Sequence, residues 1–233
     1  MPPIISIILP VLNEVRGLAD TLVNLPAAAD LEIILVDGGS TDGTWELAAR
    51  FPQVQRRRAP QGRGCQMNAG ARVAGGQLLA FLHADTQLRP EHLATLRRAA
   101  ADPTFTAGAF ELYLTPPLPV LRLISWGANQ RSRFLGWPYG DQVLTLRREL
   151  FYALRGFAHR RPEDLDLVVR LHSFTRPRLL RPPVASSGRR WLDQGYFATT
   201  RRHWLTVARY LAERALTGRW PPRGELLVSE GQG

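Results

Sequence analysis

The chain has 233 residues, 45% of them hydrophobic, which suits a single α/β domain with a sizeable core, and no apolar run approaches the ~20 residues of a membrane span. The single cysteine, Cys65, excludes an internal disulfide and a cysteine-based metal site, and it fits a reducing compartment. The formal net charge is +10 and every basic residue is an arginine, which predicts an anionic partner such as a phosphate-bearing ligand, a membrane surface or a nucleic acid.

The first hundred residues alternate between strand and helix patterns. Strands are predicted at residues 4–9, 31–36, 54–58 and 78–82. Helices are predicted at 16–25 and 43–50, from a glycine-rich turn at 62–64 to residue 73, and at 90–101, where Pro90 opens the first turn. Repeated β-α-β units at this spacing predict a Rossmann-like, mostly parallel central sheet flanked by helices.

The second half alternates less regularly. Strands are predicted at 106–114, where a run of prolines follows, and at 143–146. Helices are predicted at 121–134, at 163–174, which opens with acidic residues, and as one long segment at 191–216. We expect one domain over residues 1–220 and a flexible tail at 221–233, which is rich in proline and glycine.

Residues 33–44, with the sequence IILVDGGSTDGT, carry the strongest local signal. The strand at their start, residues 33–36, is short and apolar enough to be buried on both faces, and it stops at Asp37. A carboxylate at the carboxyl end of a buried parallel strand lies where open α/β sheets bind ligands. The alternative is that Ser40, Thr41 and Asp42 only cap the next helix, and we assign the cap to these three and the ligand site to Asp37.

Polar residues follow two further strands, at 13–14 and at 83–85. Because parallel strands present their carboxyl ends at one edge of the sheet, we expect these groups and Asp37 to converge. The chain lacks G-x-G-x-x-G after its first strand and also lacks G-x-x-x-x-G-K, which excludes a dinucleotide fingerprint and a P-loop. Carboxylates beside a phosphate ligand point to a bridging divalent cation, usually Mg²⁺, and Arg63 adds a forked contact to a diphosphate.

A set of motifs spans most of the chain in fixed order. They are PVLNE at 10–14, VDGGSTDGT at 36–44, GRG with NAG at 62–70, LHAD at 82–85, GDQ at 140–142 and PED at 162–164. In this order and spacing they resemble the family 2 glycosyltransferases of GT-A fold, with small bacterial members that lack membrane segments as the nearest subgroup. The resemblance covers roughly residues 4–191, and it implies a nucleotide-sugar-binding half at 1–101, an acceptor and catalytic half at 102–190 and a C-terminal helical segment at 191–220.

The resemblance implies an inverting transfer of a sugar from a nucleotide-diphospho-sugar, expected to be a uridine one, to an acceptor hydroxyl. Asp164, next to Glu163, would be the general base, and Asp141 would help to hold the acceptor or the donor sugar. Asp85 would bind the metal that bridges the diphosphate. The matched motifs imply a donor site made of Pro10, Asn13, Glu14, Asp37, Gly39, Arg63, Asn68, His83, Ala84, Asp85 and Arg190.

Two departures from the family pattern leave alternatives open. His83 stands where the family motif begins with Asp, and because imidazole favours softer ions than a carboxylate does, the metal is either Mg²⁺ or Mn²⁺. The alternative is that His83 only caps a strand end. Ser187 stands where the Arg-Trp element of processive members carries Gln, so Arg190 either clamps the diphosphate or lies on the surface.

Two other functional classes remain as alternatives. A nucleotidyltransferase of similar architecture usually carries a glycine-rich signature after its first strand, where 13–15 reads NEV. A non-catalytic nucleotide- or polyanion-binding protein explains the charge but not the acidic residues at strand ends. Nucleic acid is not the expected partner, because the arginine pairs are scattered along the chain.

The acceptor and the location depend on the C-terminal segment. Residues 191–216 form either a helix face packed on the core or on a second copy in a homodimer, or a membrane-surface helix flanked by arginines. In the first arrangement Trp204, Leu205, Val207, Leu211 and Leu216 face the packed side. The acceptor is either a small molecule or lipid-linked. No secretory signal begins the chain, so we expect a cytoplasmic location. The alternative is a cytoplasmic protein that contacts the inner membrane face peripherally.

Overall fold

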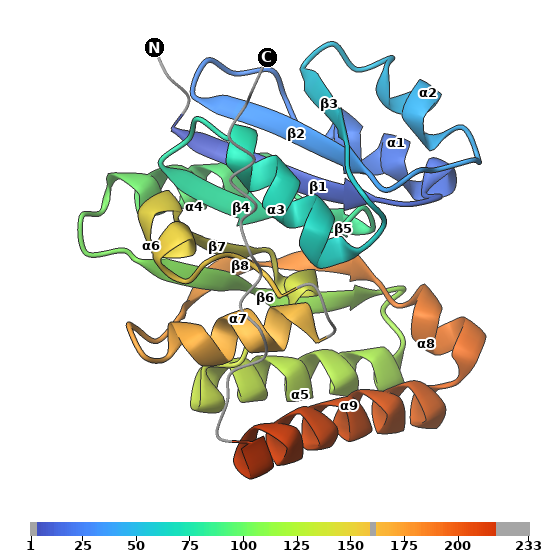
Figure 1. The fold of residues 1–233 in the computed structure, drawn as a ribbon. Helices are drawn as coiled ribbons and strands as arrows, with labels where there is room; N and C mark the ends of the chain where they lie inside the picture. Colours follow the sequence, from blue (N-terminus) through green and yellow to red (C-terminus); the bar gives the residue numbers. More distant parts are fainter. Residues whose placement is uncertain (1–3, 159–161, 218–233) are drawn as a thin grey trace.

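The fold is an eight-stranded sheet with helices on both faces, and the computed structural model describes residues 4–158 and 162–217 (Figure 1). The strands follow one another across the sheet in the order β3-β2-β1-β4-β7-β6-β8-β5. Their bounds are β1 (Ile5–Val11), β2 (Leu31–Asp37), β3 (Val54–Arg58), β4 (Leu78–Phe81), β5 (Thr86–Gln87), β6 (Ala107–Thr115), β7 (Leu144–Arg147) and β8 (Arg178–Ser187).

The helices range from 5 residues in α2 to 22 residues in α9. Their bounds are α1 (Val15–Val23), α2 (Thr44–Ala48), α3 (Arg63–Val73), α4 (Pro90–Ala101), α5 (Pro119–Leu135), α6 (Arg148–Ala153), α7 (Glu163–Leu171), α8 (Arg189–Gln194) and α9 (Tyr196–Thr217), with a 3₁₀ turn, η1, at Gly140–Gln142. The predicted α/β class is confirmed.

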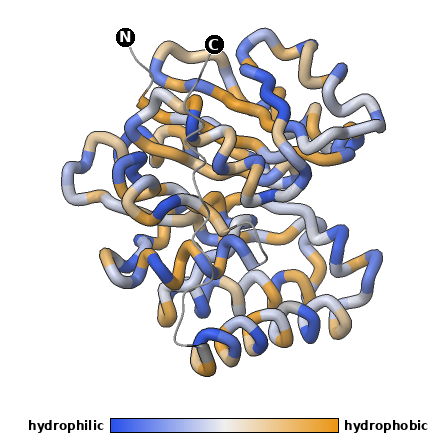
Figure 2. Tube along the Cα trace, in the orientation of Figure 1, coloured by the Kyte–Doolittle hydropathy of each residue, from blue (hydrophilic) through white to orange (hydrophobic). Residues whose placement is uncertain are grey.

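The first four strands form the parallel half of the sheet, because β1 pairs in parallel with β2 and β4, and β2 with β3. Alternate residues of β1 enter two different cores: Ile7 packs with α1 and α4, and Ile8 packs with α3, α6 and α7. Burial on both faces explains why these strands are uninterrupted apolar runs, which appear as hydrophobic segments through the middle of the molecule (Figure 2).

The other half of the sheet is mixed, so the parallel arrangement is continuous only over the first four strands. β7 runs antiparallel to both β4 and β6, while β6 and β8 are parallel. β8 is absent from the predicted elements because Pro182 and Pro183 lie inside it, and proline is unfavourable in a strand with neighbours on both sides.

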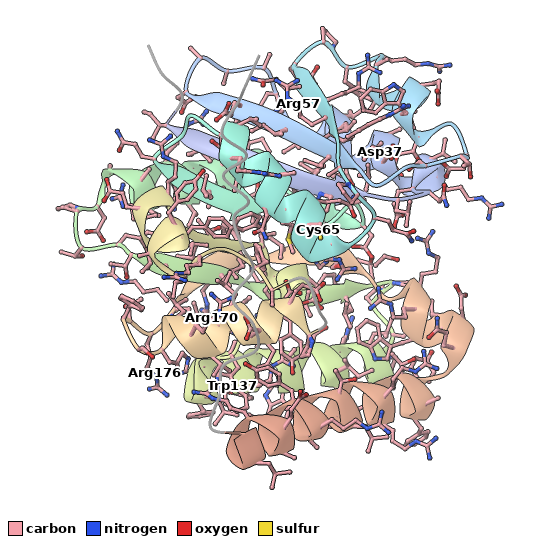
Figure 3. The ribbon with its side chains drawn as sticks, viewed as in Figure 1. Asp37, Arg57, Cys65, Trp137, Arg170 and Arg176 are labelled. Carbon is pink, nitrogen blue, oxygen red and sulfur yellow. The ribbon has the colours of Figure 1, made fainter. Side chains whose placement is uncertain are left out.

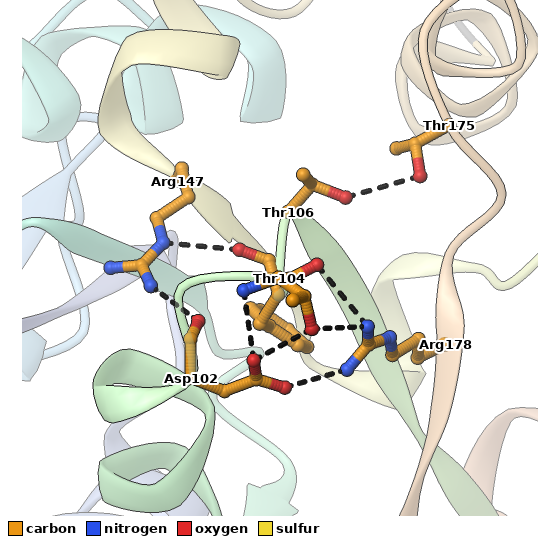
Figure 4. Close-up of polar contacts among 7 residues, drawn as sticks. Asp102, Thr104, Thr106, Arg147, Thr175 and Arg178 are labelled. Atoms are coloured by element: carbon orange, nitrogen blue, oxygen red, sulfur yellow. Dashed lines mark hydrogen bonds and ion pairs between the residues drawn. The ribbon is translucent and has the colours of Figure 1, made fainter.

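The start of β6 is fixed by polar contacts to three other segments (Figure 4). The carboxylate of Asp102 accepts hydrogen bonds from Thr104 N at 2.8 Å and from Arg178 Nη1, on β8, at 2.8 Å. Arg147 of β7 donates to the carbonyl oxygens of Asp102 and Phe105. The Thr104 contacts, helped by Arg178, lower the pKa of Asp102 to about 2, so this anchor is ionised at neutral pH.

The prediction of one helix at 191–216 is wrong, because the segment breaks at Gly195, whose φ of +81° favours glycine. α9 packs on α7 through Val207, Tyr210 and Leu211, which confirms core packing for that face. Trp204, Leu205 and Leu216, predicted to lie on the same face, are instead 62%, 49% and 87% exposed. In the described part of the chain no helix is both long and apolar enough to cross a membrane, and residues 221–233 lie outside it.

Candidate active site

A cavity of about 400 Å³ opens at the carboxyl ends of the parallel strands. The loop after β4 contributes His83 and Asp85, and the start of α3 contributes Arg63. Because β7 runs antiparallel to β4, the loop that precedes β7 reaches the same edge and brings Asp141. The first turn of α7, together with α8 and α9, closes the remaining walls. Segments about 80 residues apart in sequence, at 83–85 and 162–165, therefore meet in one site.

Asp164 is the carboxylate most strongly affected by this environment. Its Oδ2 accepts a hydrogen bond from Gly140 N at 3.2 Å. Burial, reinforced by the neighbouring charge of Glu163, raises the pKa of Asp164 to about 7, against the opposing effect of Arg63. A carboxyl group with a pKa near the working pH can accept a proton from a substrate hydroxyl.

Asp141 and Arg63 set the charge around Asp164. Burial raises the pKa of Asp141 despite the opposing effect of Arg131, and its Oδ1 is buried without a hydrogen-bond partner among the described residues. Arg63 Nη1 lies 3.7 Å from Oε1 of the buried Glu163. The pair leaves Arg63 at the cavity wall, where its guanidinium is available to an anionic ligand.

His83 lies against Gly140 with its Nε2 buried and without a hydrogen-bond partner among residues 4–158 and 162–217. Burial, then the charges of Arg63 and Arg190, hold the pKa of His83 well below its ordinary value, so the imidazole is neutral. A neutral imidazole nitrogen aimed at a polar cavity can bind a metal ion. A simple strand cap does not account for this orphaned atom.

The donor set suits a metal held jointly with a substrate. Within the described ranges no group of three or more His, Cys, Asp or Glu residues could hold a metal ion by itself. Mg²⁺ and similar ions are commonly held by one or two protein ligands and by substrate phosphates. Asp85 and His83, both at the cavity wall, fit that pattern.

The η1 loop that carries Asp141 is braced by residues the sequence did not single out. The Arg131 guanidinium stacks on the Tyr139 ring, 3.6 Å from its centre, and Arg131 Nε donates to the carbonyl oxygen of Trp137 at 2.9 Å. The buried side chain of Gln142 accepts a hydrogen bond from Ser132 Oγ at 2.7 Å. In the sequence only the GDQ motif indicates this loop, because the residues that brace it come from α5.

Hydrogen bonds of Arg170 and Asp166 to other segments hold α7, which carries Glu163 and Asp164. Arg170, labelled in Figure 3, donates from Nη2 to Asp166 Oδ2 at 2.6 Å and to the carbonyl oxygen of Gly156 at 2.7 Å. On the other side Tyr210 of α9 donates its hydroxyl to Asp166 Oδ1 at 3.1 Å. The position of the catalytic candidate therefore depends on α9.

The predicted nucleotide-side residues lie in a second group, beside the cavity. Asp37, at the end of β2 (Figure 3), is fully buried, and its carboxylate accepts hydrogen bonds from Gly39 N, Ser40 N and Ser40 Oγ. Asn13 joins the same loop through Ser40 Oγ at 3.0 Å. Asp37 thus shapes the loop with its own oxygens, and its direct contact with a ligand stays a prediction.

The assigned cap role of the 40–42 segment is confirmed in part. Asp42 accepts hydrogen bonds from Thr44 N at 3.0 Å and from Val15 N at 3.1 Å, and Thr44 Oγ1 accepts one from Glu14 N at 2.8 Å. The N-cap position of α2 is occupied by Gly43, so these side chains join two loops more than they cap a helix.

Glu14 faces the C-terminal region. Its Oε2 lies 3.8 Å from Arg189 Nη2, and both residues line a second cavity of about 520 Å³ together with Asn13. Burial, followed by the charge of Asp85, raises the pKa of Glu14, and Arg189 opposes the shift. Glu14 and Asp85 are therefore close enough to influence one another across the two cavities.

The predicted site residues divide into those that line a cavity and those that do not. The cavity wall contains Arg63, His83, Asp85, Asp141, Glu163, Asp164 and Arg190. Pro10, Asp37, Gly39, Asn68 and Ala84 line neither cavity. Asn68 is a structural residue, because Phe157 uses both its amide groups: Nδ2 donates to Phe157 O and Oδ1 accepts from Phe157 N, each at 2.9 Å.

Comparisons with known proteins agree with this geometry. The sequence model described as "Glycosyl transferase family 2" matches residues 6–152, which is more than half of the chain. The chain belongs to glycosyl transferase family 2. The match ends before α7, so the family 2 assignment does not itself cover Asp164.

Curated relatives of this family 2 chain match less than half of its length. A PGL/p-HBAD biosynthesis glycosyltransferase of Mycobacterium bovis is 38% identical over 107 residues, which are 42% of this chain and 41% of that protein. The chain thus spans about two fifths of the length of the relative it matches.

Solved structures match more of the fold. The mannosyltransferase PcManGT from Pyrobaculum calidifontis, in complex with GDP-Man and Mn²⁺, has a TM-score of 0.65 and 24% identity, with 96% of this chain and 67% of that chain covered. S. aureus TarS 1-349, in complex with UDP-GlcNAc, has a TM-score of 0.65 and 15% identity over 79% of this chain and 58% of that one. These similarities establish the GT-A fold.

Proposed function

We propose that this protein is an inverting, metal-assisted glycosyltransferase that moves a sugar from a nucleotide-diphospho-sugar to an acceptor hydroxyl. The observation that carries the proposal is Asp164, a buried carboxylate with a pKa of about 7, in one cavity with the anion-binding arginines Arg63 and Arg190. Family membership and the nucleotide-sugars held by the TarS and PcManGT structures support it.

Asp164 acts as the general base. It takes the proton of the acceptor hydroxyl while that oxygen attacks the anomeric carbon, and the nucleoside diphosphate leaves with the bonding electron pair. A single displacement of this kind inverts the anomeric carbon. Burial favours the protonated product form of Asp164, so the raised pKa makes the carboxylate a stronger base than an exposed one.

The arginines at the cavity wall act on the leaving group. Arg63 is fixed by Glu163 and Arg190 lies at the start of α8, so negative charge that grows on the diphosphate meets two guanidinium groups. Asp85 and His83 would hold a divalent cation, Mg²⁺ or Mn²⁺, which when bound neutralises diphosphate charge.

The nucleoside is proposed to lie on the side of the second cavity. Asn13 and Glu14 line that cavity, and the loop shaped by Asp37 is joined to Asn13. We propose a uridine donor from the family resemblance, with a guanosine donor as the competing result. Both kinds of nucleotide are found in complexes of the structural neighbours.

The proposal is tested by donor hydrolysis and transfer with UDP-glucose, UDP-GlcNAc and GDP-mannose, each with Mg²⁺, Mn²⁺ or EDTA. We expect one donor to turn over only with metal, Asp85→Ala to abolish turnover, and Asp164→Asn to lower kcat by about 10²–10⁴-fold. Asp20→Asn, on the exposed side of α1, is the matched control that removes a carboxylate far from the cavity. Failure of all donors to bind, or full activity in the Asp164 variant, overturns the proposal.

Peripheral membrane contact is proposed for the outer face of α9. Phe197, Trp204 and Leu216 are 93%, 62% and 87% exposed there, and arginines flank them in a chain of net charge +10. Anionic lipid complements that charge, whereas a second copy of the same basic face would repel it. We expect the protein to co-sediment with phosphatidylglycerol vesicles but not with phosphatidylcholine vesicles. Co-sedimentation that does not depend on Trp204, or a dimer in light scattering, contradicts the membrane contact.

A further inference from the structure

The cavity has a second wall to which no motif assigns a role. Gln194 of α8 and Thr199, Arg202 and Thr206 of α9 line it. The carboxylates of the cavity come from the loop after β4, the η1 loop and α7, while this wall carries none. The cavity is thus acidic where the strands end and basic where the C-terminal helices cover it.

Thr199 has a polar group that the described part of the protein does not satisfy. The residue is only 2% exposed, and its Oγ1 is buried without a hydrogen-bond partner among the described residues. Buried hydroxyl groups in folded proteins nearly always have a partner, and an unpaired one at a cavity wall is a place where a ligand or water binds.

Arg202 lies close to Thr199 on the same helix face, three residues further along α9. Its Nη1 donates to Gln194 Oε1 at 3.1 Å, and within residues 4–158 and 162–217 no carboxylate forms an ion pair with it. No carboxylate of the described residues therefore neutralises its charge, in contrast to Arg63, which is paired with Glu163. A guanidinium group presents its N–H donors in a fork that matches an oxyanion.

We propose that this wall is the acceptor subsite and that it takes an acceptor bearing an oxyanion, such as a phosphate group. The inference rests on the proposed function, because it identifies the acceptor of that same reaction. Arg202 holds the oxyanion and Thr199 donates its hydroxyl hydrogen to the acceptor. The reacting hydroxyl of the acceptor then faces Asp164 on the opposite wall.

The subsite does not change which bonds form and break in the reaction. The bond from the acceptor oxygen to the anomeric carbon forms and the bond from that carbon to the diphosphate oxygen breaks. Asp164 receives the proton of the hydroxyl, and the electron pair leaves with the nucleoside diphosphate. The oxyanion takes no part in bond making, so its contacts fix orientation and affinity.

The test measures probe binding by calorimetry in protein first saturated with UDP and Mg²⁺, so that the region of the diphosphate is filled. The probes are sn-glycerol 3-phosphate, glycerol as the uncharged match, and lysophosphatidic acid, a lipid-type phosphate that keeps a free hydroxyl. The variants are Arg202→Gln and Thr199→Val. Arg201→Gln is the matched control, since this neighbouring arginine is exposed and outside the cavity.

We expect sn-glycerol 3-phosphate to bind and glycerol not to bind, with an affinity lost by about tenfold or more in Arg202→Gln and kept in Arg201→Gln. Tighter binding of lysophosphatidic acid than of sn-glycerol 3-phosphate assigns the phosphate to a lipid acceptor, and weaker binding assigns it to a soluble one. We expect Thr199→Val to weaken binding of the phosphate probe. The unfolding temperature of this variant should be unchanged or higher, because the substitution removes an unsatisfied buried group.

Two failures are distinguishable. Absence of UDP binding in the first titration refutes the proposed function. Normal UDP binding with no preference for the phosphate probe over glycerol, or an equal loss in the Arg201 and Arg202 variants, overturns the subsite. A lower unfolding temperature in Thr199→Val with unchanged probe affinity also overturns it, since the hydroxyl is then structural.

Discussion

Gly140 is the position where one added methyl group most directly probes the site. It lies in η1, between His83 and Asp164, and a Cβ built there would sit 2.4 Å from His83 Nε2 and 2.6 Å from Asp164 Oδ2. Ordinary contact for a Cβ begins at 3.4 Å. Gly140→Ala must therefore move the candidate metal ligand and the candidate base by about 1 Å, or move the loop that carries Asp141.

The expected cost follows from that displacement. Catalytic groups misplaced by about 1 Å lose roughly 10²-fold in rate, which is about 2.7 kcal/mol in the activation barrier. Crowding a packed site costs about 1–3 kcal/mol of folding free energy, which a stable domain tolerates. We therefore expect kcat to fall about a hundredfold in a protein that remains folded.

The assay is steady-state turnover of the active donor, with urea unfolding and UDP affinity measured on the same samples. Gly127→Ala is the control, because Gly127 lies within α5 and an added Cβ there meets nothing within 4 Å. That variant should keep full activity and gain about 0.5–1 kcal/mol of stability. Activity of Gly140→Ala within twofold of the native protein, or a loss explained by unfolding alone, would refute the reasoning.

Three further outcomes follow from the same contacts. Turnover should rise with pH through about 7 as Asp164 loses its proton, and Asp164→Asn should lower kcat by about 10²–10⁴-fold and flatten that profile. The folded pKa of Asp164 lies above its unfolded value of 3.8, so its contribution to stability falls as pH rises from about 4 to about 7. Asp164→Asn should therefore also raise the unfolding temperature at pH 8. An unchanged unfolding temperature contradicts the raised pKa of Asp164. Tyr210→Phe removes the donor to the buried Asp166 and should cost about 1–3 kcal/mol in urea unfolding and lower kcat, whereas an unchanged midpoint shows that α9 does not hold α7. EDTA should abolish turnover, and His83→Asp should shift the preference from Mn²⁺ toward Mg²⁺; equal metal preference in both proteins argues against His83 as a ligand.

The parallel half of the sheet and the members of the cavity could be predicted from local pattern. Strands buried on both faces, such as Ile33–Val36, are continuous apolar runs, and polar residues at their carboxyl ends must meet at one edge. His83, Asp85, Asp141 and Asp164 therefore lie together as predicted. β8 escaped prediction because Pro182 and Pro183 contradict the local pattern of a strand.

The hydrogen-bond partners of buried polar groups could not be predicted in the same way. Asn68 lies in a motif that implied a donor contact, yet its amide is used by Phe157, 89 residues away. Asp37 was expected to bind a ligand, and its oxygens are taken by the loop that follows it. Such choices depend on which distant backbone groups lie within about 3 Å after packing, and sequence spacing does not encode that.

The sequence by itself determined which chemistry gathers at the sheet edge, because hydrophobic periodicity and strand polarity are local properties of the chain. The tertiary structure alone decided how that chemistry is tuned. Burial and the charge of Glu163 raise the pKa of Asp164, and after the break at Gly195 α9 brings Thr199 and Arg202 to the cavity wall. Desolvation and charge proximity arise only when remote segments pack together, and this is the physical reason why the site's residues could be predicted before their protonation states and partners.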